Sequence, residues 1–157
     1  MITPDKNIKK LKLKPHPKEG GYFFETYRSK DKSKNGSIAT AIYFLLTPET
    51  FSAVHKLDKD EIFHFYAGDP VEMLQLYLGG AGETVILGSD VLKGMVPQVI
   101  VKKNVWQGSR LQKGGQFALL GTTMSPGFEY KDYHDCDKQA LIKKYPKFKK
   151  MISALVR

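Results

Sequence analysis

The chain has 157 residues, of which 41% are hydrophobic, and its formal net charge is +9 at pH 7. This length and apolar content suit a single domain with one core. The single cysteine, Cys136, excludes an internal disulfide. No apolar run reaches the roughly 18–20 residues of a membrane span, and the first residues lack a signal-peptide pattern. A cytoplasmic protein is therefore expected.

The positive charge is concentrated at the two ends. Residues 1–18 carry six basic and one acidic side chain, and residues 136–157 carry seven basic and one acidic, which leaves 12 basic and 14 acidic side chains between them. A protein that binds nucleic acid would combine basic and aromatic groups on one surface. Nucleic acid is therefore disfavoured as a partner, and the basic ends are interpreted as solvated segments.

Short segments rich in aromatic and β-branched residues follow one another through the centre of the chain, separated by turns such as Asn35-Gly36 and Gly114-Gly115. Strands are expected over 20–29, 37–46, 50–57, 61–68, 71–78, 83–88, 97–103, 116–124 and 128–134. About nine short strands, with no long helical pattern between them, predict an all-β antiparallel sandwich or barrel and exclude parallel βαβ units.

The last part of the chain has a helical pattern instead. Asp137 is expected to cap a helix over 138–144, and Pro146 suits the first turn of another. One face of that second helix carries Phe148, Met151, Ile152 and Leu155. The sequence thus predicts one domain over 1–157, with a basic N-terminal lead-in at 1–15 and a basic helical tail at 136–157.

Two histidines and a glutamate lie close together in FSAVHKLDKDEIFHF (51–65). Because side chains alternate between the two faces of a strand, a hairpin around residues 58–60 would bring His55 and Glu61 onto one inner wall. His64 has the opposite parity to Glu61, so it is expected to point away from that wall.

The same segment resembles the first motif of the cupin superfamily, which reads H-x-H, three residues, E, six residues, G. His55 and Glu61 occupy matching positions, and Leu57 replaces the second histidine. A later stretch, VKKNVWQG (101–108), resembles the second cupin motif, with Gln107 where its histidine would stand.

Longer stretches resemble the uncharacterised RmlC-like cupin family, a domain of unknown function. They are HPKEGGYFFETYRS (16–29), AIYFLL (41–46), HKLDKDEIFHFYAGDP (55–70), PQVIV (97–101), VWQG (105–108) and SPGFEYKDY (125–133). The chain departs from that family in its long HPKEGG segment and in Phe63, where a tryptophan is expected. The resemblance implies a double-stranded β-helix, the cupin or jelly-roll barrel, with a pocket at one mouth, and commonly a homodimer.

A cupin metal site uses three imidazoles and a carboxylate, which suit transition metals. The aligned set in this chain is His55, Leu57, Glu61 and Gln107. No metal cofactor is therefore expected, and a metal, if present, would have only His55, Glu61 and Gln107 as ligands. These three side chains are better suited to hydrogen bonding with a ligand in an aromatic cavity, or to satisfying one another in the core.

Further candidates surround these three residues. Arg28, near a strand end, could bind an anionic group of a ligand or form an ion pair with Glu25 or Asp31. His16, between two prolines, is expected to be exposed. The candidate ligand-binding residues are Gln107, Tyr22, Glu25, Tyr27, Arg28, Phe63, Trp106 and Phe128.

Together these features predict a cupin-fold protein that binds a small polar or sugar-like ligand in the barrel pocket. Metal-free acid–base chemistry of the isomerase or epimerase type would use His55 and Glu61 as candidate catalytic residues, an analogy that rests on the fold alone. The alternatives are a non-catalytic module that binds or senses a small molecule, and a metal-dependent cupin enzyme. The sequence leaves open whether the protein is an enzyme.

Overall fold

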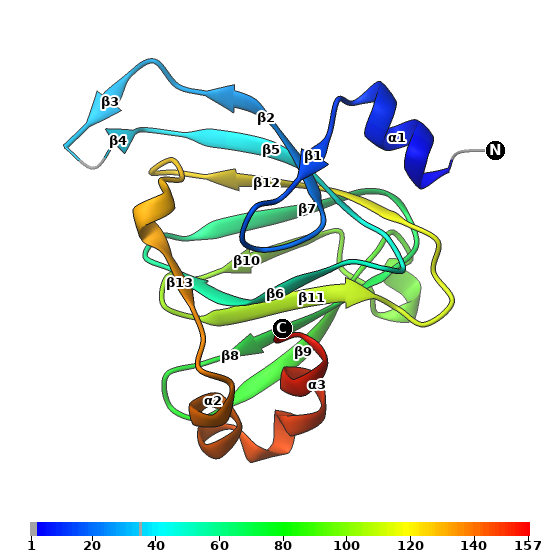
Figure 1. The fold of residues 1–157 in the computed structure, drawn as a ribbon, viewed down its shortest axis with the longest axis vertical. Helices are drawn as coiled ribbons and strands as arrows, with labels where there is room; N and C mark the ends of the chain where they lie inside the picture. The colour runs from blue at the N-terminus through cyan, green and yellow to red at the C-terminus, as the bar shows by residue number, and fades with distance from the viewer. Residues whose placement is uncertain (1–2, 35) are drawn as a thin grey trace.

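The computed structural model describes residues 3–34 and 36–157, so the predicted turn at Asn35-Gly36 lies partly outside the described residues. Two antiparallel sheets form a barrel (Figure 1). The larger has the strand order β1 (Lys14–Pro15), β2 (Tyr22–Arg28), β5 (Thr40–Leu46), β12 (Ala118–Met124), β7 (Glu61–Gly68) and β10 (Gln98–Val101). The smaller has the order β13 (Tyr133–Asp135), β6 (Phe51–Leu57), β11 (Trp106–Leu111), β8 (Val71–Leu76) and β9 (Gly82–Leu87). A separate hairpin joins β3 (Lys32–Ser33) to β4 (Gly36–Ser37).

The core lies between the two sheets and confirms the predicted all-β jelly-roll barrel. Phe44, Phe63 and Leu120 come from the larger sheet, while Met73 and Leu87 come from the smaller one, and all five are buried. Each belongs to a strand whose side chains alternate between core and outer face, which is the pattern of a closed sheet pair.

In the sheets, β11 and β13 differ from the sequence-based expectation. β11 was not among the predicted strands because WQGSRL has few β-branched residues, yet it pairs with both β6 and β8 along its length. The predicted strand over 128–134 is instead the short 3-10 helix η2 (Tyr130–Asp132) followed by β13. The helix forms because the side chains of Glu129 and Asp132 cap each other's backbone N–H groups.

The N-terminal lead-in contains a helix that was not predicted, α1 (Pro4–Lys10). Thr3 accepts a hydrogen bond from the backbone N–H of Lys6, and proline stands at the first helical position, both of which favour a helix start. Residues that follow α1 pack on the outer face of the larger sheet, where Leu13, Leu45 and Phe117 form a small cluster.

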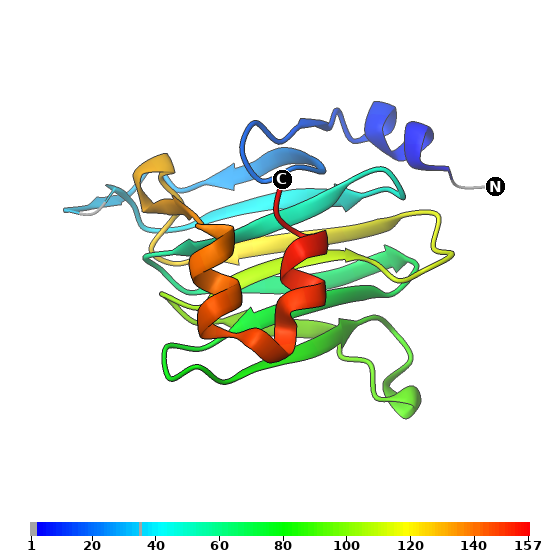
Figure 2. The ribbon, with the colours of Figure 1, turned by 60° about the horizontal axis from the view of Figure 1, so that its bottom comes forward.

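The C-terminal tail is helical, as predicted. α2 (Lys138–Lys144), η3 (Pro146–Phe148) and α3 (Lys149–Ala154) lie across the outer face of the smaller sheet (Figure 2). Ile152 and Leu155 pack there against Leu74 and Leu76 of β8, and the carbonyl of Leu155 accepts a hydrogen bond from the backbone N–H of Val54. A further short helix, η1 (Val91–Lys93), follows β9. No helix among the described residues is long and apolar enough to span a membrane.

Removing the cap of α2 is expected to destabilise the protein modestly. The Asp137 carboxylate accepts a hydrogen bond of 2.8 Å from the backbone N–H of Ala140. Asp137→Ala should therefore lower the free energy of unfolding by about 1 kcal/mol in urea titration, while Asp137→Asn, which retains an acceptor, should cost much less. Equal losses for the two variants would contradict a capping role.

Candidate functional site

A pocket opens between the two sheets at one end of the barrel. The space between its walls, open solvent at the mouth included, is about 570 Å³. Phe23, Ile42 and Met124 form much of its apolar wall. Its acidic and basic side chains are His16, Glu19, Glu25, Arg28, His55 and Glu61.

Glu61, the first residue of β7, lines the pocket but is only 7% exposed. The side chain of Gln107 donates a hydrogen bond of 2.8 Å to its carboxylate. Burial, together with the negative charge of Glu19, raises the pKa of Glu61 to about 7, although His55 and the hydrogen bond from Gln107 oppose the shift. This carboxyl group therefore exchanges a proton near neutral pH.

His55 lies on β6 and is 1% exposed. Its ring stacks on the ring of Tyr133, with centroids 4.7 Å apart, and its Nδ1 is 2.8 Å from the carbonyl oxygen of Ala53. Burial lowers the pKa of His55, so the imidazole is neutral at pH 7, although Glu61 acts in the opposite direction. Gln107 faces His55 across the β6–β11 ladder, so the three polar residues predicted to lie together do so, and the side chain of Gln107 supports Glu61.

The segment 16–21 contributes two polar side chains that were not predicted to belong to the site. His16 was expected to be exposed, and this was wrong: His16 and Glu19 both line the pocket. The backbone carbonyl of Glu19 accepts from the N–H of Ala53 at 2.8 Å, and its side chain accepts from the Ser52 hydroxyl. Flanking prolines indicate only the local conformation of His16, whereas these long-range bonds fold the segment over the gap between β2 and β6.

Arg28 lines the pocket but its guanidinium is already bound. It donates two hydrogen bonds to Glu25, at 2.9 and 2.8 Å, and one each to Glu129 and the carbonyl of Phe128, both at 3.1 Å. A bulge between Glu25 and Tyr27 breaks the alternation of β2 and brings Glu25 and Arg28 to the same side. Of the two roles considered for Arg28, the structure contains the ion pair with Glu25.

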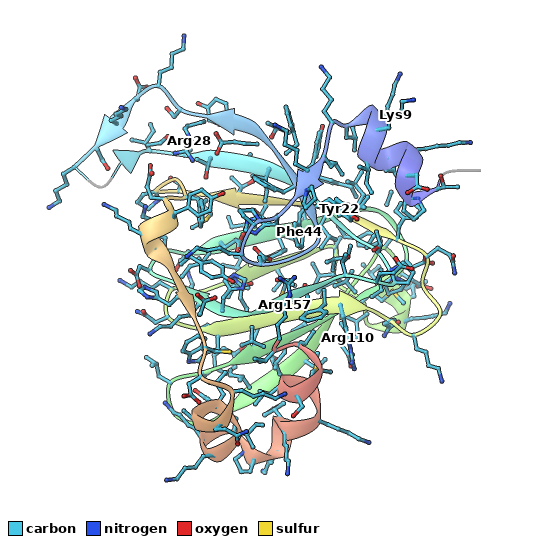
Figure 3. All side chains as sticks on the ribbon, viewed as in Figure 1. Lys9, Tyr22, Arg28, Phe44, Arg110 and Arg157 are labelled. Atoms are coloured by element: carbon cyan, nitrogen blue, oxygen red, sulfur yellow. The ribbon has the colours of Figure 1, made fainter. Side chains whose placement is uncertain are left out.

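Five of the predicted site residues line the pocket, namely His55, Glu61, Glu25, Arg28 and Phe128. Gln107, predicted to bind the ligand, is 2% exposed and is not among the lining residues, and four others also lie outside the pocket. Tyr22 is at the opposite end of β2 from Arg28 and packs with residues near α1 (Figure 3). Tyr27 is exposed, and Phe63 is in the central core. Trp106 faces the helical tail and carries the Lys56 ammonium over its ring at 5.2 Å.

These four placements have a common cause. Each residue is next to, or two positions from, a site residue on the same strand, so its side chain points to the other face or lies deeper in the barrel. His64 follows the same rule as predicted, because it faces away from the pocket and hydrogen-bonds Thr123 and Gln98 at 3.1 and 3.3 Å. Among residues that were not predicted, Tyr133 lines the pocket from β13, where no local sequence signal indicates its position.

A family model described as "Cupin superfamily (DUF985)" matches residues 5–135. The chain belongs to the cupin superfamily. Among solved structures, this cupin is similar to protein SO0799 from Shewanella oneidensis, with 34% identity, a TM-score of 0.92 and coverage of 100% of this chain and 99% of that one. It is also similar to a hypothetical protein from Leishmania major, with 31% identity, a TM-score of 0.89 and 99% coverage of both chains.

A cupin 2 conserved barrel domain protein from Rhodopseudomonas palustris shares the fold at 11% identity, with a TM-score of 0.60 and coverage of 92% of this chain and 86% of that one. No curated protein matches the chain. The comparisons therefore confirm the family and its barrel.

The donor set of this cupin does not fit the metal site known from its superfamily. Leu57 is a hydrocarbon, and the Gln107 amide nitrogen is directed at Glu61. Across residues 3–34 and 36–157, no three His, Cys, Asp or Glu side chains are arranged to hold a metal ion. Transition metals in cupins require more imidazole and carboxylate ligands than His55 and Glu61 provide.

Proposed function

We propose that this cupin binds a small, uncharged, sugar-like molecule in its barrel pocket, and that His55 and Glu61 act on it by metal-free acid–base chemistry of the isomerase or epimerase type. The observation that carries the proposal is the hydroxyl of Tyr133. It is buried in the pocket wall without a hydrogen-bond partner among the described residues. Buried polar groups almost always have a partner, and a movement of the Tyr133 ring toward the pocket would let a ligand hydroxyl supply the missing one.

The charges of the pocket favour an uncharged ligand. Arg28 is the only cation among its described lining residues, and four of its five N–H donors are taken by Glu25, Glu129 and the Phe128 carbonyl. An anionic ligand would instead approach the carboxyl groups of Glu19 and Glu61. The hydroxyl groups of a sugar can donate to carboxylates and accept from other donors, and its apolar face suits the aromatic wall.

The proposed chemistry divides between two groups. The Nδ1–H of His55 donates to the Ala53 carbonyl, so the neutral ring keeps its lone pair on Nε2 and can act as a base. Glu61, whose pKa is about 7, can return a proton as an acid. Removal of a proton beside a carbonyl and its return at the same or a neighbouring carbon would isomerise a sugar without any net oxidation.

The Gln107–Glu61 hydrogen bond supports a second candidate function, in which the pocket binds or senses the same ligand without catalysis. In that case Glu61 would be a fixed acceptor. Conversion of the bound molecule to an isomer would exclude this candidate.

Mass spectrometry of small molecules released from the purified protein tests the proposal. A polyhydroxylated compound should be released from the wild type and from Leu78→Trp, a control at an exposed site, and strongly reduced in Ile42→Trp, which fills the pocket wall. Equal release from both variants would contradict binding in the pocket. Elemental analysis that finds roughly one transition metal per chain would contradict metal-free chemistry.

We also propose that the protein is a homodimer that uses the outer face of the larger sheet. Two cross-strand rows on this face contain no carboxylate, ammonium or guanidinium group: Gln98, His64, Gly121, Tyr43 and Phe24 in one, and Ile100, Ile62, Thr123, Ala41 and Tyr27 in the other. Phe24, Tyr27, Tyr66 and Ile100 are exposed there. A second copy could cover this face without desolvating any charge, although the chain as a whole carries +9.

Introducing a charge on this face is expected to dissociate the dimer. Tyr66, which is 52% exposed, lies over Gly121 at the centre of the sheet. In sedimentation velocity at micromolar concentration, the wild type should have twice the 17.7 kDa mass of the chain and Tyr66→Glu should be monomeric. Leu92→Glu, at a 96% exposed site in η1, should remain dimeric. A monomeric wild type, or equal dissociation of both variants, would refute the interface.

A further inference from the structure

We propose that His16 is the hydrogen-bond donor of the pocket and His55 its acceptor, so that the site is built for a ligand group that both accepts and donates, as a hydroxyl does. The two imidazoles come from segments far apart in the sequence, and both line the pocket. The inference rests on the proposed function for the ligand, but the state of the two rings is a property of the protein alone.

The backbone determines which nitrogen of His55 carries the proton. Nδ1 is 2.8 Å from the carbonyl oxygen of Ala53. A carbonyl only accepts hydrogen bonds, so Nδ1 must carry the hydrogen, and Nε2 of the neutral ring is an acceptor. No hydrogen bond from any residue within 3–34 or 36–157 reaches this Nε2, which leaves its lone pair for a ligand.

The backbone determines the opposite state for His16. Its Nδ1 accepts hydrogen bonds from the backbone N–H groups of Glu19 at 2.9 Å and Lys18 at 3.4 Å. Backbone N–H groups only donate, so Nδ1 must be unprotonated, and Nε2 carries the hydrogen. The ring is held in place by an edge-on contact with Phe23, whose centroid is 4.7 Å away.

The surroundings of both rings favour the neutral form at pH 7, in which one nitrogen donates and the other accepts. Burial is the main cause and lowers the pKa of each imidazole. The carboxyl group of Glu19 raises the pKa of His16, whereas His55 and Arg157 lower it further. The carboxyl groups of Glu61 and Asp135 raise the pKa of His55 and so oppose the effect of burial.

Two opposite tautomers in one pocket select among ligands. A hydroxyl can accept from Nε2–H of His16 and donate to Nε2 of His55. A carboxylate could accept from His16 but could not donate to His55, and at pH 8 it would be repelled by Glu61, whose pKa is about 7. An uncharged sugar is therefore favoured over a sugar acid of the same shape.

Long-range ¹H–¹⁵N correlation spectra of the histidine-labelled protein at pH 8, assigned with single substitutions, test the tautomers without any ligand. Two other histidines serve as references: Nε2 of His134 donates to Asp58 at 2.8 Å, and Nδ1 of His64 accepts from Gln98. We expect the Nε2–H form for His16, His64 and His134, and the Nδ1–H form for His55 alone. An Nε2–H signal for His55, an Nδ1–H signal for His16, or a charged ring for either would overturn the proposal.

The same spectra with millimolar D-glucose or D-glucuronate test the selectivity. Glucose should shift the Nε2 signals of His16 and His55, and glucuronate should not. The glucose shift of His55 should be lost in His16→Phe, which keeps a ring against Phe23, and retained in His134→Phe. A response to glucuronate alone would overturn the selectivity. No response to either sugar would contradict the proposed function. The tautomers of His16 and His55 are tested separately, by the spectra recorded without a sugar.

Discussion

Glu61→Gln is expected to stabilise the protein at pH 8 by up to about 3 kcal/mol. The folded protein holds the pKa of Glu61 at about 7, above the value of 4.5 for the free side chain. Between pH 4.5 and pH 7 the Glu61 side chain binds more protons in the folded state than in the unfolded state. The free energy of unfolding of the wild type therefore falls as the pH rises through this range. The glutamine remains neutral and can still accept from Gln107, so it avoids the cost of a buried charge.

Urea titrations at pH 5 and pH 8 measure this effect. The stability difference between Glu61→Gln and the wild type should be small at pH 5 and large at pH 8. Glu49→Gln, at an exposed site in the loop between β5 and β6, should show no such change. A Glu61→Gln variant that is less stable than the wild type at pH 8 would show that Glu61 is ionised and well solvated in the folded protein.

His55→Ala is expected to cost about 3 kcal/mol of stability and to abolish ligand binding. The substitution leaves a cavity against Tyr133 and removes the donor to the Ala53 carbonyl. For a domain of this size the melting temperature should fall by roughly 10 °C. Truncation alone would not show whether His55 is structural or functional, because the ring is fully buried.

His55→Phe separates the two roles. It keeps a ring of similar size against Tyr133 but has no nitrogen, so it should lose less stability than His55→Ala and bind ligand equally poorly. Thermal melting beside binding of the co-purified compound gives both quantities. Intact affinity in His55→Phe would mean that the imidazole has only a structural role.

Strand alternation was sufficient to predict the centre of the site. It placed His55 and Glu61 on one wall and His64 on the other, and the hydrogen bonds of all three residues agree. It worked because the irregularities of the two strands, between Ser52 and His55 in β6 and between Phe65 and Ala67 in β7, lie outside the stretch from His55 to His64. The barrel followed from the same patterns and from the motifs of the superfamily.

The periphery of the pocket could not be predicted in the same way. The bulge in β2 changes the parity of Arg28, and nothing in YFFETYR indicates where an extra residue is inserted. Segment 16–21 turns back through Gly20 and Gly21, whose φ angles are +99° and +68°, so the paired glycines were its one visible signal. That His16 and Glu19 then reach the pocket depends on contacts with Ser52 and Ala53 on a distant strand.

A crystal structure of the protein as purified tests the proposed ligand site most directly. We expect an ordered organic molecule in the pocket, with hydroxyl groups bound to the Tyr133 hydroxyl, to Nε2 of His55 and to the carboxyl group of Glu61. A metal ion coordinated by His55 and Glu61 in its place would contradict the proposal. So would a pocket in which ordered water alone satisfies the Tyr133 hydroxyl.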